Sequence, residues 1–303
     1  MLERISITCF AASYGVALGL EISRLIFHSA WRNVLLWIFA LAGLIAHTLY
    51  LGYRGYEAVL THHTPLSSSA EYYLLAAWVL GVMYLLTLAL QPRARSGIFF
   101  LPLVLLLIAT SRFADGQPFP QERAASIWFT LHTLLLLLGY VVVVFGFAMG
   151  IMYLLQAARL KAKQPPTARF RLPNLEWLEL ANQRSVVGAA ILIILGIVAG
   201  VIFNLVQQGI IPWHDPVIWR SAIITGWLIC ALLFCALYRP AQRGRKVAYL
   251  TIASFLFLMV SVLLGLVFKS EHKAPQPLVN RVRIEAVNRG MAACRRCAGE
   301  ACA

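Results

Sequence analysis

Long hydrophobic runs separated by short polar segments dominate the pattern of this chain. Eight such runs occur, at residues 5–23, 34–53, 72–90, 97–112, 126–156, 186–208, 218–238 and 247–268. Most are near the roughly 20 residues that a helix needs to cross the hydrocarbon core of a bilayer. They lack the alternation of a transmembrane strand, and backbone groups in lipid must be paired within their own segment. The sequence therefore predicts an all-α fold, a polytopic membrane bundle of about eight transmembrane helices.

Three of these runs differ from the rest. The fourth is short and contains Pro102, whereas the fifth is long enough, at about 1.5 Å per residue, to extend beyond the membrane. The first could instead be a signal peptide. Its charged start is meagre, however, and Glu21 and Arg24 follow closely. We therefore expect it to stay attached as an uncleaved span.

Composition agrees with a membrane location, and charge predicts an orientation. The chain is 60% hydrophobic and 13% charged, with a net charge of +14, which excludes an ordinary soluble domain. Because Lys and Arg accumulate in cytoplasmic loops, the alternate loops that carry most of them should face inward. These basic residues are Arg24, Arg32, Arg93, Arg95, Arg159, Lys161, Lys163, Arg169, Arg171, Arg184, Arg239, Arg243, Arg245 and Lys246. Both termini and the loops at 54–70, 113–125 and 209–217 are then predicted to face outward from a bacterial-type inner membrane.

The C-terminal tail is predicted to be a separate region. Residues 1–272 form the expected membrane domain, and residues 273–303 are basic and lack an apolar core, so we expect disorder there. The tail contains Cys294 and Cys297 in a Cys-x-x-Cys spacing. No histidine follows Cys297, so the pair is not a haem attachment motif, and no thioredoxin-like context surrounds it to support a redox pair. The sequence contains no recognisable nucleic-acid-binding module.

Histidines gather at the predicted outer face. His62, His63, His214 and His272 lie in or beside outer segments, and His132 lies at the outer end of the fifth run. A single histidine at a helix end is more often an interfacial polar residue. A set of imidazoles at one face instead indicates metal or haem ligation, since imidazole is a common metal ligand and a usual axial ligand of haem iron.

Aromatic residues favour haem over a bare metal ion. Trp128 precedes His132 by one helical turn, so both lie on one helix face. The outer segment 212–219 reads "PWHDPVIW" and contains Trp213, His214, Asp215 and Trp219. Tryptophan belts are routine at membrane interfaces, but this combination also suits a flat, amphipathic ring that bears iron.

Glycines form a stripe along the fifth run. Gly139, Gly146 and Gly150 share a helix face with His132, and Gly196 and Gly200 form a Gly-x-x-x-Gly in the sixth run. Small residues let helices approach closely in lipid. We therefore expect these glycines to serve helix packing.

Several segments carry a family resemblance. They are "HTPLSSSAEYYLLAAW" with His63, Glu71 and Trp78, "WFTLHTLLLLLGY" with Trp128 and His132, "RLPNLEWLE", "WLICALLFCALYRPAQRGRKVAYL" and "LLGLVFKSEHK". In this order they resemble the cytochrome c assembly family, the CcsA and HemX-like haem-handling membrane proteins. The resemblance covers residues 55–272. It implies that His132 and His272 are the two axial ligands of a non-covalently held haem b, with Trp213, His214, Asp215 and Trp219 packed against the ring.

The resemblance also implies roles for polar neighbours. Glu71 would bind a proton or support His63, and an acid at a helix start also suits the helix dipole. Arg112 and Arg123 could pair with propionates. The chain departs from the family where His214 replaces an expected Trp and where Cys235 and Tyr238 stand near the position of an inner histidine of CcsA proteins.

Two functions therefore stay open. One is the presentation of haem at the outer face to apocytochrome c, together with a second assembly membrane protein, at most as part of a haem lyase complex. The other is a HemX-like regulator or scaffold for a haem-biosynthesis enzyme, without haem transfer. The outer histidines favour the first, and the departures favour the second. The absence of an inverted repeat in the sequence argues against a transporter.

Overall fold

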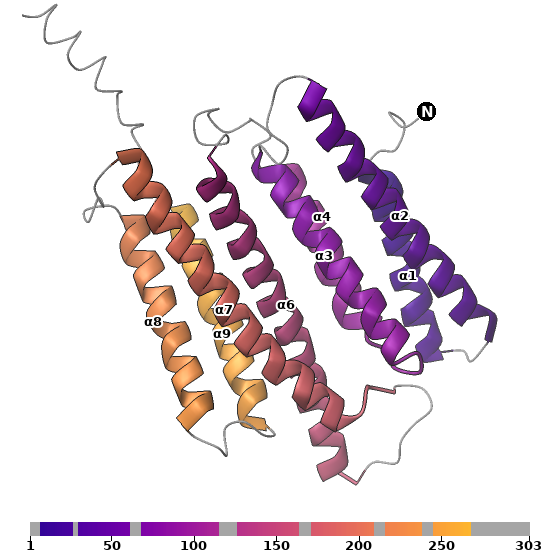
Figure 1. Cartoon of the computed structure of the whole chain (residues 1–303). Helices are drawn as coiled ribbons and strands as arrows, with labels where there is room; N and C mark the ends of the chain where they lie inside the picture. Colours follow the sequence, from indigo (N-terminus) through magenta and orange to yellow (C-terminus); the bar gives the residue numbers. More distant parts are fainter. Residues whose placement is uncertain are drawn as a thin grey trace, which may run out of the picture. The chain divides into compact units, whose positions relative to one another are not determined.

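The computed structural model describes residues 7–26, 30–60, 68–114, 126–163, 171–208, 216–237 and 245–267. Within these ranges every regular element is an α-helix, as the hydrophobic runs predict (Figure 1). The helices are α1 (Ile7–Ile26), α2 (Ala30–Leu60), α3 (Ser69–Leu90), α4 (Gly97–Phe113), α6 (Ile127–Lys161), α7 (Leu175–Gln208), α8 (Pro216–Leu237) and α9 (Arg245–Val267). The C-terminal tail lies outside the described residues.

Four of these helices are long and apolar enough to cross a membrane. They are α2, α3, α6 and α7, over Trp31–Ala58, Ser69–Leu90, Ile127–Lys161 and Leu175–Gln207. Helix α4 and the central parts of α8 and α9 are apolar but shorter. The expected all-helical membrane bundle is confirmed, and the chain is a membrane protein.

Helix α4 contains a proline, Pro102, in its first half. It starts directly after Ser96 and runs through Pro102 to Phe113. Proline lacks a backbone N–H, so it removes one hydrogen bond from a helix interior. Pro102 lies near the start of α4, where only one preceding turn is affected. The fourth hydrophobic run is therefore a helix of 17 residues despite its proline.

Helix α6 connects two apolar clusters. Helices α1, α2, α3 and α4 pack on one another, α6 contacts α3, α4 and α7, and α7 contacts α8. The first cluster includes Phe10, Tyr84 and Met149, and the second includes Val143 and Ile193. Since Met149 and Val143 both belong to α6, this helix contributes to both clusters and holds the two groups of helices together.

Glycines bring α6 close to α7, which confirms the packing role expected of the stripe. A Cβ added at Gly139 would lie 2.5 Å from Ile193 Cγ1, and one at Gly196 would lie 2.9 Å from Leu136 Cδ2. Gly146 and Gly150 face α9 in the same way, because an added Cβ would approach Thr251 or Ala248. Close approach of this kind lets helices associate in lipid, where the hydrophobic effect no longer drives association.

Two side-chain hydrogen bonds, one buried and one partly buried, attach α9 to its neighbours. The Thr251 and Asn182 side chains pair at 2.7 Å between α9 and α7. The Trp227 Nε1 of α8 donates to the Ser254 hydroxyl at 3.2 Å. Interhelical hydrogen bonds between such polar side chains are worth about 0.6 to 2 kcal/mol in membranes.

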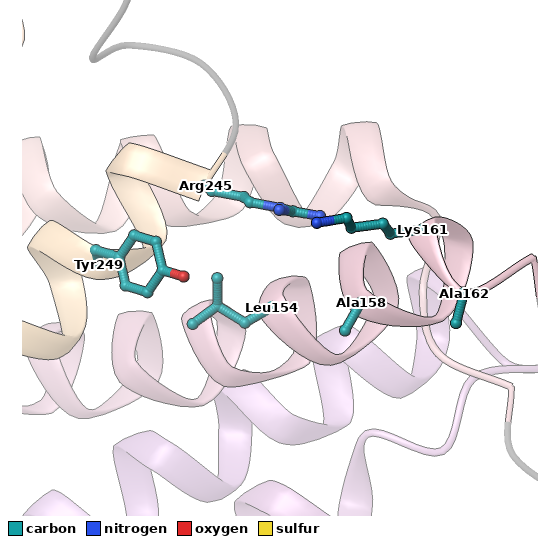
Figure 2. Close-up of a pocket in the computed structure, with 6 residues that line it drawn as sticks. All are labelled: Leu154, Ala158, Lys161, Ala162, Arg245 and Tyr249. Carbon is teal, nitrogen blue, oxygen red and sulfur yellow. The ribbon is translucent and has the colours of Figure 1, made fainter.

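Basic residues meet at one end of the bundle, which we call the basic end. Arg24 donates to the Glu21 carboxylate at 2.5 Å in the last turns of α1. The Arg95 backbone N–H donates to the Arg171 carbonyl at 2.8 Å, and the Arg245 guanidinium donates to the Ala157 carbonyl at 3.3 Å. Arg245 and Lys161 are shown together in Figure 2. The structure thus gathers at one end the loops that the charge pattern assigns to one side.

Two of these basic residues are buried, which the charge pattern did not predict. Glu21 is fully buried, and Arg24 and Arg95 are 7% and 5% exposed. Glu21 lies at the start of α4, because a Cβ added at Gly97 would be 3.1 Å from Glu21 Cγ and 2.9 Å from the Tyr84 hydroxyl oxygen. We call Glu21, Arg24, Tyr84 and Arg95 the buried polar cluster. Its residues connect α1 with α3 and α4.

Candidate functional site at the start of helix α6

His132 is fixed by a contact with α7 at the end of α6 that is opposite the basic end. Its Nδ1 lies 2.7 Å from the carbonyl oxygen of Gly196. A carbonyl oxygen only accepts hydrogen bonds, so this pairing assigns the proton to Nδ1. The other ring nitrogen, Nε2, then carries a lone pair. His132 is half-buried, so its ring is oriented by the protein without being sealed inside the core.

Two glycines of α7 create the space for the imidazole. A Cβ added at Gly200 would lie 2.5 Å from His132 Nδ1 and 2.6 Å from Cε1, which is closer than atoms can approach. The Gly196 carbonyl one turn earlier can accept from His132 because a carbonyl oxygen has two lone pairs, of which the helix uses one. The Gly-x-x-x-Gly of α7 therefore serves both helix packing and the placement of His132.

Aromatic side chains occur on the helices around this histidine. Trp128, one turn before His132 on α6, is half-buried. Phe129 packs on Phe203 of α7 with ring centroids 5.5 Å apart. Trp219 lies in the first turn of α8 and is 60% exposed. The described part of the site is thus one oriented imidazole with apolar, aromatic surroundings on α6 and α7.

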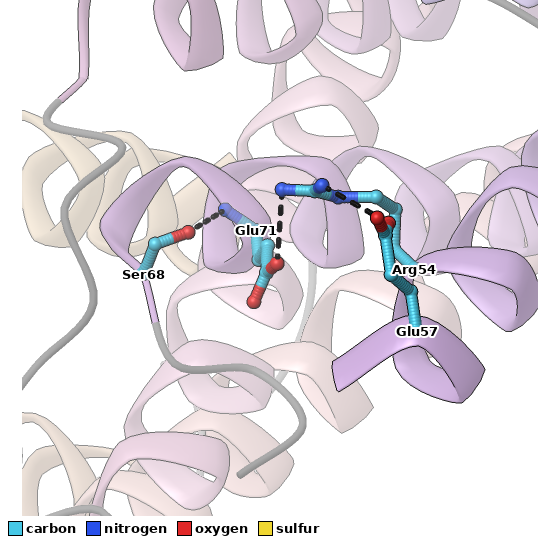
Figure 3. A network of polar contacts seen from close by, with 4 residues as sticks. All are labelled: Arg54, Glu57, Ser68 and Glu71. Carbon is cyan, nitrogen blue, oxygen red and sulfur yellow. Dashed lines mark hydrogen bonds and ion pairs between the residues drawn. The ribbon is translucent and has the colours of Figure 1, made fainter. Parts of the chain in front are cut away.

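Glu71 takes part in an ion-pair network at the start of α3 (Figure 3). Its carboxylate lies 3.5 Å from Arg54 Nη2 of α2, and Arg54 also approaches Glu57 at 3.5 Å. The Glu71 backbone N–H donates to the Ser68 side chain at 3.4 Å, which caps the helix. Glu71 therefore has a structural role as a partner of Arg54 and as an acid in the first turn of α3, where it suits the helix dipole.

Several predicted site residues lie outside the described residues. They are His63, Trp213, His214, Asp215 and His272. The pairing of His132 with His272, the aromatic outer loop and the support of His63 by Glu71 therefore stay predictions. Among the residues that the structure describes, no three His, Cys, Asp or Glu side chains gather as a metal site.

His47 lies in the second hydrophobic run, on helix α2. It is fully buried. Its ring stacks on Phe10 of α1, with centroids 4.2 Å apart and an interplanar angle of 6°. Tyr14 approaches it edge-on at 6.2 Å. His47 thus belongs to the core between α1 and α2 and is not part of the His132 site.

The His132 environment fits a single axial ligand for haem. Metal-ligating histidines usually donate their second ring N–H to a carbonyl or carboxylate, which sets the tautomer and the ring orientation. The contact from His132 Nδ1 to the Gly196 carbonyl has this form. Trp128 and Phe129 provide apolar surface beside it. His47 is the only other histidine among the described residues, and it belongs to the core between α1 and α2.

The fold and this site define a class, a polytopic helical membrane protein with an oriented histidine at one end of its bundle. A model of the cytochrome C assembly protein family matches residues 66–270, more than half of the chain. The chain belongs to this family, and it has a role in cytochrome c biogenesis. No curated protein matches the chain significantly.

Gly200→Ala is expected to disturb His132 and to destabilise the fold. The added methyl group would overlap the imidazole, so the α6–α7 contact has to open or the ring has to turn. Overpacking of this kind costs about 1–3 kcal/mol of unfolding free energy, which SDS titration of the purified protein would measure. The matched control is Gly188→Ala on the same helix, where an added Cβ meets nothing within 4 Å. Equal stability of the two variants would contradict the tight His132 contact.

Proposed function

We propose that this protein holds haem b non-covalently at the His132 end of the bundle and presents it to apocytochrome c. The observation that carries the proposal is the His132 geometry, in which Nδ1 donates to the Gly196 carbonyl and Nε2 is left to bind iron. Membership of the cytochrome c assembly family supports haem as the cargo. The charge pattern supports an outward position for this end, because the basic residues gather at the opposite end.

The residues of the chain would act by position. His132 ligates the iron, and Gly196 and Gly200 keep the imidazole from rotating. Trp128, Trp219 and the predicted outer loop with Trp213, His214 and Asp215 cover the apolar ring. Such a site holds the vinyl groups toward the thiols of a Cys-x-x-Cys-His segment, while the bond-forming chemistry comes from haem and thiols.

Two elements of the proposal rest on the sequence. His272 is the proposed second axial ligand, and a second assembly membrane protein is the proposed partner that completes the site. His63 and Glu71 are proposed to lie at its edge. Support for Glu71 is its place at the start of α3, at the same end of the bundle as the start of α6. The Tyr72 side chain, next to Glu71, lies close to that of Thr133, next to His132.

The test of this function combines binding with maturation. Protein purified in detergent from haem-replete cells is expected to show a low-spin haem absorption band that sharpens on reduction. Cells that depend on this chain are expected to attach haem to a reporter apocytochrome c and to fail when the chain is absent. Purified protein that contains no haem and takes none up would overturn the proposal, whatever the maturation result.

A scaffold for a haem-biosynthesis enzyme is the second candidate function. The observation that favours it is the basic end, where Lys161, Arg245 and Lys246 are exposed. A scaffold predicts that variants at the basic end reduce haem synthesis while His132 variants do not. Haem presentation predicts that His132 variants reduce the haem attached to apocytochrome c, while variants at the basic end do not reduce haem synthesis. Measuring total haem and attached haem in both sets of variants therefore separates the two functions.

A further inference from the structure

An open pocket lies at the basic end, between the last turns of α6 and the first turns of α9. Its volume is about 560 Å³, and its lining residues are Leu154, Ala158, Lys161, Ala162, Arg245 and Tyr249 (Figure 2). It lies at the opposite end of α6 from His132, so it is not part of the proposed haem site.

The two cations of the pocket point toward one another. In Figure 2 the side chains of Lys161 and Arg245 extend from α6 and α9 toward one another, and both line the pocket. Among the residues that the structure describes, no acidic side chain lines the pocket. Two like charges repel at short range unless solvent or an anion lies between them. An anion is therefore the ligand that this arrangement fits.

A purely structural role explains Arg245 better than Lys161. Arg245 donates to the Ala157 carbonyl, and a cation near the C-terminus of α6 is favoured by the helix dipole. The same dipole attracts Lys161, which is exposed and could extend into solvent. Its side chain instead lines the pocket together with that of Arg245, and the helix dipole alone does not explain this position.

The rest of the pocket is largely apolar. Leu154, Ala158 and Ala162 form one helix face of α6 beneath the two cations. Tyr249 adds a hydroxyl group and a ring that is 59% exposed. A charged rim above an apolar surface, at the end of membrane-spanning helices, matches an amphiphile better than a small soluble anion. Basic pockets between transmembrane helices on the cytoplasmic side bind the head groups of anionic lipids.

We propose that this pocket binds the phosphate head group of an anionic membrane lipid. Lys161 and Arg245 hold the phosphate from two sides, and the Tyr249 hydroxyl donates a hydrogen bond to it. One acyl chain lies along Leu154 and Ala158. The lipid thereby joins the start of α9 to the end of α6. This proposal does not depend on haem binding at His132.

The test is lipid binding by the purified full chain. Native mass spectrometry after addition of phosphatidylglycerol or phosphatidylcholine measures the bound lipid directly. Wild type is expected to bind phosphatidylglycerol selectively, and the Lys161→Ala, Arg245→Ala double variant to bind it at least about tenfold more weakly, since each basic residue near a lipid surface contributes to binding. The swap Lys161→Arg with Arg245→Lys, which keeps both charges, is expected to retain binding even if the alanine variant folds poorly.

The matched control removes one positive charge from α6 and one from α9, at residues that do not line the pocket. Arg159→Ala with Lys246→Ala changes neighbours that do not line the pocket and is expected to bind phosphatidylglycerol like wild type. An equal loss of phosphatidylglycerol binding in both double variants would show a general effect of charge and would overturn the proposed lipid site. Equal binding of the two lipids by wild type would overturn it as well. Displacement of phosphatidylglycerol by millimolar inorganic phosphate would reassign the pocket to a soluble anion.

Discussion

His132→Ala is expected to abolish the low-spin haem band of the purified protein. Loss of the imidazole removes the axial ligand that the Gly196 carbonyl orients, whereas loss of a residue that only orients a ligand typically costs 10–100-fold in metal affinity. We therefore expect haem affinity to fall by at least about 100-fold. Haem titration followed by absorption spectroscopy, in the oxidised and the reduced state, measures the change.

Added imidazole provides the control for this variant. The space beside Gly196 and Gly200 remains when the side chain of His132 is removed, so free imidazole is expected to enter it and restore part of the haem band. His272→Ala, made alone, tests the second predicted ligand and is expected to give a high-spin, weakly bound haem. An unchanged spectrum in His132→Ala protein would contradict the assignment of His132 as a ligand and favour the scaffold function.

Glu21→Ala is expected to lower the free energy of unfolding by about 3–5 kcal/mol. Removal of one partner from a buried ion pair leaves an uncompensated charge in the interior. Here Arg24 would lose its hydrogen-bonded carboxylate. Burial lowers the pKa of Arg95, the positive charge of Arg24 lowers it further, and the charge of Glu21 opposes both effects. Loss of Glu21 therefore leaves two buried cations without the carboxylate that lies beside them.

An exposed carboxylate provides the matched control. Glu57 pairs with Arg54 at 3.5 Å, and its side chain is 48% exposed. Glu57→Ala is expected to cost no more than about 1 kcal/mol, since exposed ion pairs contribute little. Reversible SDS unfolding of both variants gives the comparison. The double variant Glu21→Leu with Arg24→Leu is expected to recover part of the loss. Equal effects of Glu21→Ala and Glu57→Ala would contradict a stabilising role for the buried polar cluster.

The buried polar cluster also explains how the first two helices are attached. Helices α1 and α2 precede residue 66, where the family match begins. Glu21 reaches the start of α4 at Gly97, and Phe10 stacks on His47 between α1 and α2. The Glu21 side chain at the start of α4 and a shared apolar core that includes Phe10, Tyr84 and Phe100 thus join α1 and α2 to the helices that carry the family match.

The sequence by itself determined the helices of this protein. A hydrophobic run in lipid has to form a helix because its backbone groups find no water to bind. The eight runs therefore predict the eight helices of the described residues without any knowledge of packing. Helical periodicity also placed Trp128 and the glycine stripe on the face of α6 that carries His132. The order of short motifs predicted the family that the match over residues 66–270 confirms.

Only the tertiary structure decided which polar groups meet. The Gly196 carbonyl that orients His132 is 64 residues away in the chain, and Gly200 reads as a packing residue until the imidazole is seen beside it. Arg24 and Arg95 read as loop charges, yet they are buried beside Glu21. The physical reason is that hydrophobic periodicity depends on neighbours three or four residues apart. The partner of a polar atom depends instead on how distant helices pack, which local spacing does not encode.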